Sequence, residues 1–360
     1  VTRLFFIISL YFFELKNLLL NLKCCINKFN KRKENMRAII PVAGFGTRLK
    51  PHTYSLPKVL LNVGGKPIIA HIIEKLLEEK INKATFIIGY MGDKISEYIS
   101  SHYPQLEAEY VEQAELLGLG HAVYMATPTF NDEEVFIVLG DTIFDVDLHK
   151  IFSLTESAIG IKEVEDPSRF GVTVLENDYI VKMVEKPKEL VSKLAIVGLY
   201  YIKNAALLTE CLKELIDKEI QTRGEFQLTD ALQLMIDKGE KLKTFPVEGW
   251  YDCGKPETLL STNQFLLTKN GTNRTPENVV IIHPVFISEK AKVSNCVLGP
   301  YTTIASNCVV TDSVIKNSII SPGAHVDKSL LDNSIIGTDA VVKGSLKRLN
   351  AGDSSEIEFF

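Results

Sequence analysis

The sequence predicts an open α/β sheet in the larger, N-terminal part of the chain and a parallel β-helix after it. Three observations lead to this prediction. Apolar strand-like runs alternate with amphipathic helical runs up to about residue 269, and this alternation favours a mostly parallel α/β sheet. A polar, turn-rich segment follows at residues 268–278. Beyond it, apolar residues recur about every five or six positions, which is the period of a β-helix.

The expected strands of the first part are short, continuous apolar runs, and the expected helices are amphipathic. Strands are predicted at residues 37–42, 84–90, 135–140 and 196–202. Helices are predicted at residues 67–77, with Pro67 in the first turn, and at 204–216 and 228–238. Continuous apolar strands are typical of sheets that are buried on both faces. Such sheets bind ligands at the carboxyl ends of their strands.

The predicted β-helix rests on twelve apolar positions separated by small and polar residues. These positions are Ile282, Ile287, Val293, Leu298, Ile304, Val310, Ile315, Ile320, Val326, Leu331, Ile336 and Val341. Each of them is expected to point into a shared apolar column, because each short strand stacks on the next. The tail is long enough for about three or four turns of roughly three strands each.

Composition and charge limit the class of protein. The chain has 360 residues, of which 46% are hydrophobic and 24% are charged, as in ordinary globular proteins. The formal net charge is −5, so no global basic field favours a nucleic-acid partner. Six cysteines without a CxxC pair fit reduced thiols better than a disulfide framework or a zinc site. We therefore expect a cytoplasmic protein with neither a nucleic-acid nor a membrane partner.

The first 35 residues differ from the rest, because they contain no Gly, Ala, Pro or Asp. Their apolar stretch at residues 4–13 is about half the ~20 residues that a membrane span needs. It also lacks a small-residue cleavage site. A signal or anchor and an amphipathic surface helix are two interpretations. The preferred interpretation is an over-extended start, with translation beginning at Met36.

A glycine-rich turn follows the first predicted strand, in the sequence PVAGFGTRLKPHTYSLPK at residues 41–58. A dinucleotide-binding fingerprint would need a third glycine where Leu49 stands, and a P-loop would need Gly-Lys-Ser/Thr. A simple β-turn explains Gly44 and Gly46, but it does not explain the cations Arg48 and Lys58. Glycines let backbone N–H groups approach a ligand closely, and the two cations indicate that this ligand is an anion.

This stretch, followed by GGKPII, resembles the signature of the sugar-1-phosphate nucleotidylyltransferases, which is Gly-x-Gly-Thr-Arg, then Pro, then Pro-Lys. The resemblance covers almost the whole chain after Met36. It implies a Rossmann-like domain with a mixed, mostly parallel sheet at residues 36–269, after a leader at 1–35. A linker at 270–278, a left-handed parallel β-helix of hexapeptide repeats at 279–345 and a tail at 346–360 would complete the chain. The resemblance also implies the reaction. An oxygen of the sugar 1-phosphate would attack the α-phosphorus of a nucleoside triphosphate, and pyrophosphate would leave.

The resemblance implies a catalytic group made of Arg48, Lys58 and Asp141. Because both substrates are polyanions, catalysis is mostly positioning and charge neutralisation. Arg48 suits the leaving pyrophosphate, and Lys58 suits a point charge beside the α-phosphate. Asp141 ends the apolar run VFIVLGD, and Asp252 stands in GWYDCG. Two carboxylates with phosphate oxygens suit Mg²⁺, and helix capping is the alternative role for either aspartate.

The resemblance also assigns residues to the two substrates. The nucleotide-binding residues would be Ala43, Gly44, Gly46, Thr47, Gln113 and Gly118. The residues that bind the sugar phosphate would be Gly171, Glu185, Lys186, Gly198, Tyr200, Arg223 and Trp250. The Gln113 amide can donate to and accept from a pyrimidine edge. Surface roles for Gln113 and the Glu185–Lys186 pair, and core packing for Trp250, are the alternatives.

The choice of nucleotide and sugar stays open at this point, since Ala43 stands where many thymidylyltransferases have glycine. A glutamine that reads a pyrimidine edge favours dTTP or UTP, with glucose 1-phosphate as the acceptor. A mannose-1-phosphate guanylyltransferase is one alternative, and a non-catalytic regulatory relative is an alternative from another class. Acyl transfer by the β-helix is a third possibility, but structural roles are expected for His283 and His325. We expect the tail to mediate contacts in a homo-oligomer.

Overall fold

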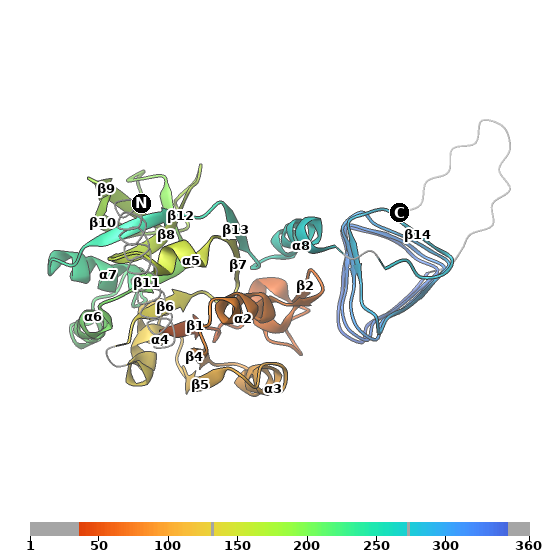
Figure 1. The fold of residues 1–360 in the computed structure, drawn as a ribbon, viewed down its shortest axis with the longest axis horizontal. Coiled ribbons are helices and arrows are strands. Elements are labelled where there is room, and N and C mark those ends of the chain that lie inside the picture. Colours follow the sequence, from red (N-terminus) through yellow and green to blue (C-terminus); the bar gives the residue numbers. More distant parts are fainter. Residues whose placement is uncertain (1–35, 131–132, 272–273, 345–360) are drawn as a thin grey trace, which may run out of the picture. The chain divides into compact units, whose positions relative to one another are not determined.

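The computed structural model describes residues 36–130, 133–271 and 274–344 (Figure 1). The predicted leader at 1–35 and the predicted tail at 346–360 lie outside these ranges. The chain forms two compact units. Of the described residues, the first unit contains those up to Leu60 and those within Ile68–Asp252, and the second contains Leu61–Pro67 and those from Cys253 onward. The predicted boundary at residue 269 therefore falls near the end of helix α8 (Pro256–Asn270), inside the second unit.

The first unit is built on a mixed sheet with the strand order β5-β4-β1-β6-β11-β8-β12-β10-β9 in the described residues. Its parallel half consists of β1 (Arg37–Pro41), β4 (Lys83–Ile88), β5 (Glu107–Glu112) and β6 (Val135–Val138). The other half consists of β8 (Ser157–Glu163), β9 (Gly171–Glu176), β10 (Tyr179–Glu185), β11 (Leu194–Ile202) and β12 (Leu242–Pro246). Strand β11 runs antiparallel to β6 and β8, whereas β12 is parallel to β8. The predicted α/β architecture is confirmed.

The elements predicted in this unit are present, with small shifts at their ends. Strand β4 ends at Ile88 and β6 ends at Val138, so the residues that follow each strand already form loops at the sheet edge. Helix α2 (Ile68–Glu78) begins one residue later than predicted. The reason is that Pro67 belongs to the short strand β3 (Lys66–Pro67), which pairs with β2 (Asn62–Val63).

Helices cover both faces of the sheet (Figure 1). One face carries α2, α3 (Gly92–His102) and α5 (Leu148–Phe152), and the other carries α4 (Leu119–Ala126), α6 (Ala205–Asp217) and α7 (Leu228–Asp237). Strand β1 contributes to both cores, because Ala38 and Ile40 point to one side and Ile39 to the other. No helix within the described ranges is long and apolar enough to cross a bilayer.

The second unit contains the predicted left-handed β-helix. Its described strands form three parallel four-stranded sheets, which are the three faces of the β-helix (Figure 1). The first sheet consists of β14 (Val279–Ile281), β17 (Cys296–Leu298), β20 (Val314–Lys316) and β23 (Leu330–Asp332). The second consists of β15 (Val285–Ile287), β18 (Thr302–Ile304), β21 (Ile319–Ile320) and β24 (Ile335–Ile336). The third consists of β16 (Lys292–Ser294), β19 (Val309–Thr311), β22 (His325–Asp327) and β25 (Val341–Lys343).

The strand register arranges the inward side chains in three columns, one for each sheet. The columns are Ile281-Leu298-Ile315-Leu331, Ile287-Ile304-Ile320-Ile336 and Val293-Val310-Val326-Val342. Ten of the twelve predicted positions therefore lie in the columns. The predictions for Ile282 and Val341 were wrong, because these side chains are 48% and 61% exposed. The strand pairing places Ile281 and Val342 in the columns instead, so the regular period shifts by one residue at each end.

Within the second unit, one buried asparagine ties helix α8 to the β-helix and to the β2–β3 hairpin. The Asn263 Oδ1 accepts from Thr303 Oγ1 at 2.6 Å and from the Gly64 backbone N–H at 2.9 Å. The Asn263 Nδ2 donates to the Tyr301 carbonyl at 3.1 Å. The asparagine is fully buried, so its loss would leave polar groups without partners.

We predict that Val310 stabilises the β-helix, because the strand register points its side chain into the third column. Val310→Ala removes two methyl groups from a fully buried site and should lower the free energy of unfolding by about 2–3 kcal/mol. Val341→Ala is the matched control, since the same change at this exposed position should have little effect. Urea unfolding of the full chain measures both variants. Equal losses would contradict the assigned register.

Candidate active site

The candidate site lies at the carboxyl edge of the parallel half of the sheet. Strands β1, β4, β5 and β6 run in the same direction, so the segments that follow them share one edge. The glycine-rich turn follows β1, and Gln113 follows β5. Asp141 comes soon after the end of β6. The fold therefore gathers at this edge three features that lie far apart in the sequence.

The turn after β1 presents its backbone to solvent. Gly46 has φ 62° and ψ 34° and precedes a short 3₁₀ helix at Thr47–Leu49. This left-handed conformation suits glycine, and an added Cβ would lie 3.0 Å from the side chains of Lys58 and Thr53. The Thr53 hydroxyl fixes the turn by donating to the Gly46 carbonyl at 2.9 Å. Gly44, Thr47 and the Arg48 side chain are exposed, whereas Ala43 is buried.

An ion pair connects this turn to the end of β6. The Lys58 Nζ lies 2.5 Å from the Asp141 Oδ2, although the two residues are 83 positions apart in the sequence. The Lys58 side chain is 11% exposed and that of Asp141 is 35% exposed, so the pair is only partly screened by water. Two residues that were predicted to be catalytic are therefore in direct contact.

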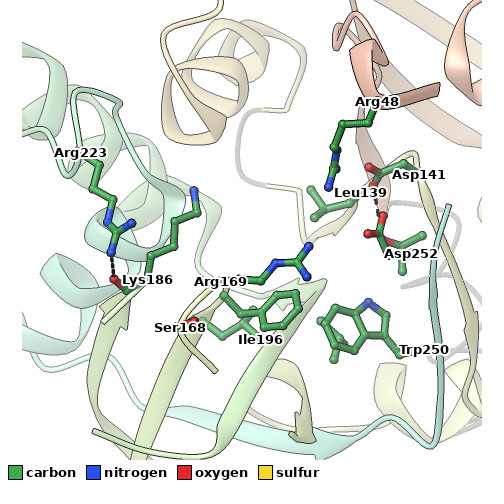
Figure 2. A pocket seen from close by; sticks show the side chains of 13 residues that line it. Arg48, Leu139, Asp141, Ser168, Arg169, Lys186, Ile196, Arg223, Trp250 and Asp252 are labelled. Carbon is green, nitrogen blue, oxygen red and sulfur yellow. Dashed lines mark hydrogen bonds between the residues drawn. The ribbon is translucent and has the colours of Figure 1, made fainter. Parts of the chain in front are cut away.

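The two predicted metal ligands are neighbours on a short antiparallel ribbon. Strand β7 (Thr142–Asp145) pairs with β13 (Gly249–Asp252), and Thr142 stands opposite Asp252. Asp141 directly precedes β7, so its carboxylate lies beside that of Asp252 (Figure 2). Within the described ranges the Asp252 carboxylate has no ion pair or hydrogen bond, and no group of three or more His, Cys, Asp or Glu could hold a metal. Two carboxylates with open positions fit a hard divalent cation that takes its other ligands from substrate phosphates and water.

A cavity of about 470 Å³ opens beside this ribbon. It is lined by Arg48, Leu139, Asp141, Thr142, Ser168, Arg169, Phe170, Lys186, Ile196, Val197, Arg223, Trp250 and Asp252. Arg48, Asp141 and Asp252 lie at one end, and Lys186 and Arg223 lie at the other (Figure 2). Arg48, Asp141 and Asp252 thus share one space with Lys186, Arg223 and Trp250. Lys58 and the predicted nucleotide-binding residues do not line it. Its lining carries more positive than negative side chains, which suits polyanionic ligands.

Two cations at the predicted sugar-phosphate end have a left-handed backbone conformation. Lys186 and Arg223 have φ of 43° and 56°, values that non-glycine residues rarely adopt and that concentrate at functional sites. The Arg223 Nη2 donates to the Lys186 carbonyl at 2.6 Å (Figure 2). The Lys186 Nζ lies 3.4 Å from Glu185 Oε1. Both cations are therefore anchored while their charged ends remain in the cavity.

Glu185 and Tyr200 lie behind the cavity lining. Glu185 stands opposite Gly171 in the β9–β10 pair, and Thr229 Oγ1 donates to its Oε2 at 2.7 Å. Burial, and then the nearby charge of Glu185, raise the pKa of Tyr200 well above its ordinary value. Gly171, Glu185 and Tyr200 do not line the cavity, although Gly171 and Glu185 adjoin residues that do.

Gly198 shapes the cavity through the backbone. It has φ 82° and lies where the β11–β8 register shifts between Ile196 and Tyr200, as glycines often do in β-bulges. Its carbonyl accepts from the Leu139 N–H at 3.1 Å, and an added Cβ would lie 2.5 Å from the Leu139 side chain. The bulge leaves Ile196 and Val197 in the cavity lining.

Gln113 lies apart from the cavity lining, at the end of the edge strand β5. It is 5% exposed. Its Nε2 lies 3.3 Å from the Gly118 carbonyl and 3.2 Å from His121 Nδ1. Burial lowers the pKa of His121, so the neutral ring can accept at Nδ1. Because both donors of the amide are used in this way, Oε1 is left as an acceptor.

The cavity contains functional candidates that the sequence did not single out. Ser168, Arg169 and Phe170 belong to the segment DPSRFGV, in which only Gly171 was predicted to bind the sugar. Phe170 packs edge-on against Trp250, with ring centroids 4.9 Å apart, so Trp250 both packs and lines the cavity. The cation two positions before Gly171 was the available signal for Arg169.

Comparison with known proteins identifies the family. Residues 37–269 match the model of the nucleotidyl transferase family. The chain belongs to this family. Within it, the chain is a sugar-1-phosphate nucleotidylyltransferase, as the following relatives indicate. Enzymes of the family generally use a divalent metal, which agrees with the carboxylate pair of this nucleotidyltransferase.

Two curated relatives match over most of the chain. The nucleotidyltransferase is similar to the bifunctional protein GlmU of Methanocaldococcus jannaschii, with 36% identity over 84% of this chain and 78% of the relative. It is also similar to the glucose-1-phosphate thymidylyltransferase of Streptomyces antibioticus, with 30% identity over 90% of this chain and 99% of the relative. A solved UDP-glucose pyrophosphorylase in complex with UDP-glucose matches with a TM-score of 0.57 and 25% identity. That match covers 65% of this chain and 99% of the solved chain.

Proposed function

We propose that this nucleotidyltransferase joins glucose 1-phosphate to UTP or dTTP, giving a nucleotide sugar and pyrophosphate. The observation that carries the proposal is a cavity with cations at both ends and a carboxylate pair at one of them. Two polyanions that must react with each other need this distribution of charge, since their repulsion opposes close approach. A regulatory protein without chemistry would not need the two carboxylates beside the cations.

The residues of the nucleotide end have distinct roles in this proposal. The exposed backbone of Gly44 and Thr47 would bind the triphosphate, and Arg48 would hold the leaving pyrophosphate. Lys58 would bring one positive charge to the α-phosphate. Asp141 and Asp252 would hold Mg²⁺, which when bound polarises phosphate oxygens and neutralises their charge.

The orientation of the Gln113 amide supports a uracil or thymine base. The free Oε1 acceptor matches a base with a ring N–H donor, and the N3–H of uracil and thymine is such a donor. Cytosine lacks this proton, so CTP should be a poor substrate. Guanine also carries a ring N–H, and a guanylyltransferase acting on mannose 1-phosphate is therefore the competing outcome.

At the other end, Lys186 and Arg223 would hold the sugar phosphate. Glu185, fixed by Thr229, would accept hydrogen bonds from sugar hydroxyls at the edge of the cavity, next to the lining residue Lys186. Gly171, Gly198 and Tyr200 would support the lining from behind. The names of the thymidylyltransferase and pyrophosphorylase relatives support glucose as the sugar. The four described cysteines Cys211, Cys253, Cys296 and Cys308 are free and buried, which supports a reducing, cytoplasmic setting.

We predict that pyrophosphate release requires UTP or dTTP together with glucose 1-phosphate and Mg²⁺. The measurement is a matrix of UTP, dTTP, GTP, CTP and ATP against glucose, mannose and N-acetylglucosamine 1-phosphates, with an EDTA control. A GTP and mannose 1-phosphate optimum would move the assignment to a guanylyltransferase. No pyrophosphate with any pair would overturn the proposal.

We also propose that the chain forms a homo-oligomer through the first sheet of the β-helix. Its outward side chains form a row of Val280, Val297, Val314 and Leu330, aligned by the strand pairing. Leu330 is 83% exposed. An apolar residue stands at this position in each of the four strands of the sheet. A second copy of the chain presents the same row. Matching surfaces of this kind are typical of contacts between identical subunits.

Light scattering should give a mass above the 40.2 kDa of one chain. Leu330→Lys places a charge in the row and should shift the mass toward that of the monomer. Val341→Lys is the matched control, because Val341 is also exposed but lies on the third sheet. A wild-type monomer would contradict this proposal.

A further inference from the structure

Arg169 is presented to the cavity by a hydrogen-bonded turn. The Asp166 carboxylate accepts from the Ser168 N–H at 3.0 Å, and the Pro167 carbonyl accepts from the Phe170 N–H at 3.0 Å. The Arg169 guanidinium lies 5.9 Å from the centre of the Phe170 ring, and that ring packs on Trp250. The base of the side chain is thus fixed by hydrogen bonds and aromatic packing.

The guanidinium itself lies between the two ends of the cavity. Figure 2 shows it between the Arg48, Asp141 and Asp252 end and the Lys186 and Arg223 end. Within the described ranges it forms no ion pair or hydrogen bond, although its charge contributes to lowering the pKa of the exposed Asp166 carboxyl. A cation that faces a cavity without a close partner has its donors available for a ligand.

The chemistry of transfer decides which group this ligand is. The attacking sugar-phosphate oxygen forms a new bond to the α-phosphorus, and the bond from that phosphorus to the bridging oxygen breaks. Pyrophosphate leaves with the electron pair, and the attacking oxygen is already ionised, so no proton has to be removed. The group that is transferred must therefore lie between the leaving pyrophosphate and the sugar phosphate. Arg169 lies between the cations assigned to those two anions.

We propose that Arg169 is a catalytic residue that binds the non-bridging oxygens of the α-phosphoryl group during transfer. This inference rests on the proposed function. Charge on these oxygens must be balanced as the phosphorus passes from one oxygen to the other. A planar guanidinium can donate two parallel hydrogen bonds to such oxygens, and donors aimed at transition-state charge are worth most inside a cavity.

Arg169→Ala and Arg169→Lys test the proposal in the full chain. The alanine variant should lower kcat by roughly 100-fold or more, the typical loss for one transition-state donor. The KM values for both substrates should change by no more than about threefold, because an interaction that is made only in the transition state adds nothing to ground-state binding. The lysine variant should recover part of kcat, since it restores the charge without the two-donor fork.

Lys182→Ala is the matched control, because it removes one exposed cation from β10 outside the cavity. It should leave kcat and both KM values unchanged. Thermal unfolding of all variants shows whether the turn and the Phe170–Trp250 contact survive. A raised KM for the sugar phosphate with unchanged kcat would make Arg169 a substrate-binding residue and overturn the proposal. An unchanged kcat in Arg169→Ala would also overturn the proposal.

Nucleotides in which sulfur replaces one non-bridging oxygen of the α-phosphate give a further readout. A purely structural role of Arg169 would not change it. If Arg169 binds a non-bridging α-oxygen, the rate ratio between the oxygen and sulfur substrates should differ between wild type and Arg169→Lys for one diastereomer. The ratio should be the same in wild type and Lys182→Ala. Equal ratios in all three proteins would contradict the inference. Absence of turnover in the wild type would overturn the proposed function, whereas an active wild type with a fully active Arg169→Ala would overturn only the role of Arg169.

Discussion

The ion pair between Lys58 and Asp141 is the interaction on which the proposed nucleotide end of the site depends. It links the turn after β1 to the residue before β7, and thereby the glycine-rich backbone to the carboxylate ribbon. Neither group is freely hydrated, so each stabilises the charge of the other. Removal of one partner would leave the other charge partly buried and unpaired.

The proposed function requires the cavity to bind two anions, and this ion pair leaves other cations available for them. With Lys58 placed against Asp141, the remaining cations Arg48 and Arg169 face the cavity without a carboxylate partner within the described ranges. Lys186 and Arg223 are held at the far end by contacts that leave their charged groups in the cavity. The site is thus organised before any substrate arrives, which reduces the reorganisation needed during transfer.

Much of the fold and of the candidate site could be predicted from the sequence, because strand ends and charge patterns are visible in short stretches of residues. The buried run before Asp141 and the cations after Gly44 and Gly46 predicted one edge of an α/β sheet, and the fold has that edge. The contact of Lys58 with Asp141 could not be predicted, since it depends on the pairing of β1 with β6.

Other features depend on geometry that has no local signal. Arg169 lies in the middle of the cavity (Figure 2), next to Phe170, which packs on Trp250 from a distant strand. In the β-helix, the average spacing of apolar residues predicted most of the inward positions. The predictions for Ile282 and Val341 failed because the register is fixed by pairing between strands of successive turns. Gly198 was predicted as a pocket residue, and the structure shows its carbonyl bonded to the Leu139 N–H at a bulge.

A double-mutant cycle on Lys58 and Asp141 tests the central claim most directly. Steady-state turnover is compared for wild type, Lys58→Met, Asp141→Asn and the double variant. We predict that each single change lowers kcat/KM for the nucleotide at least about 100-fold, and that the double variant loses much less than the product of the two. Single variants that keep wild-type turnover, or losses that simply multiply, would contradict the claim that the two residues act as one unit.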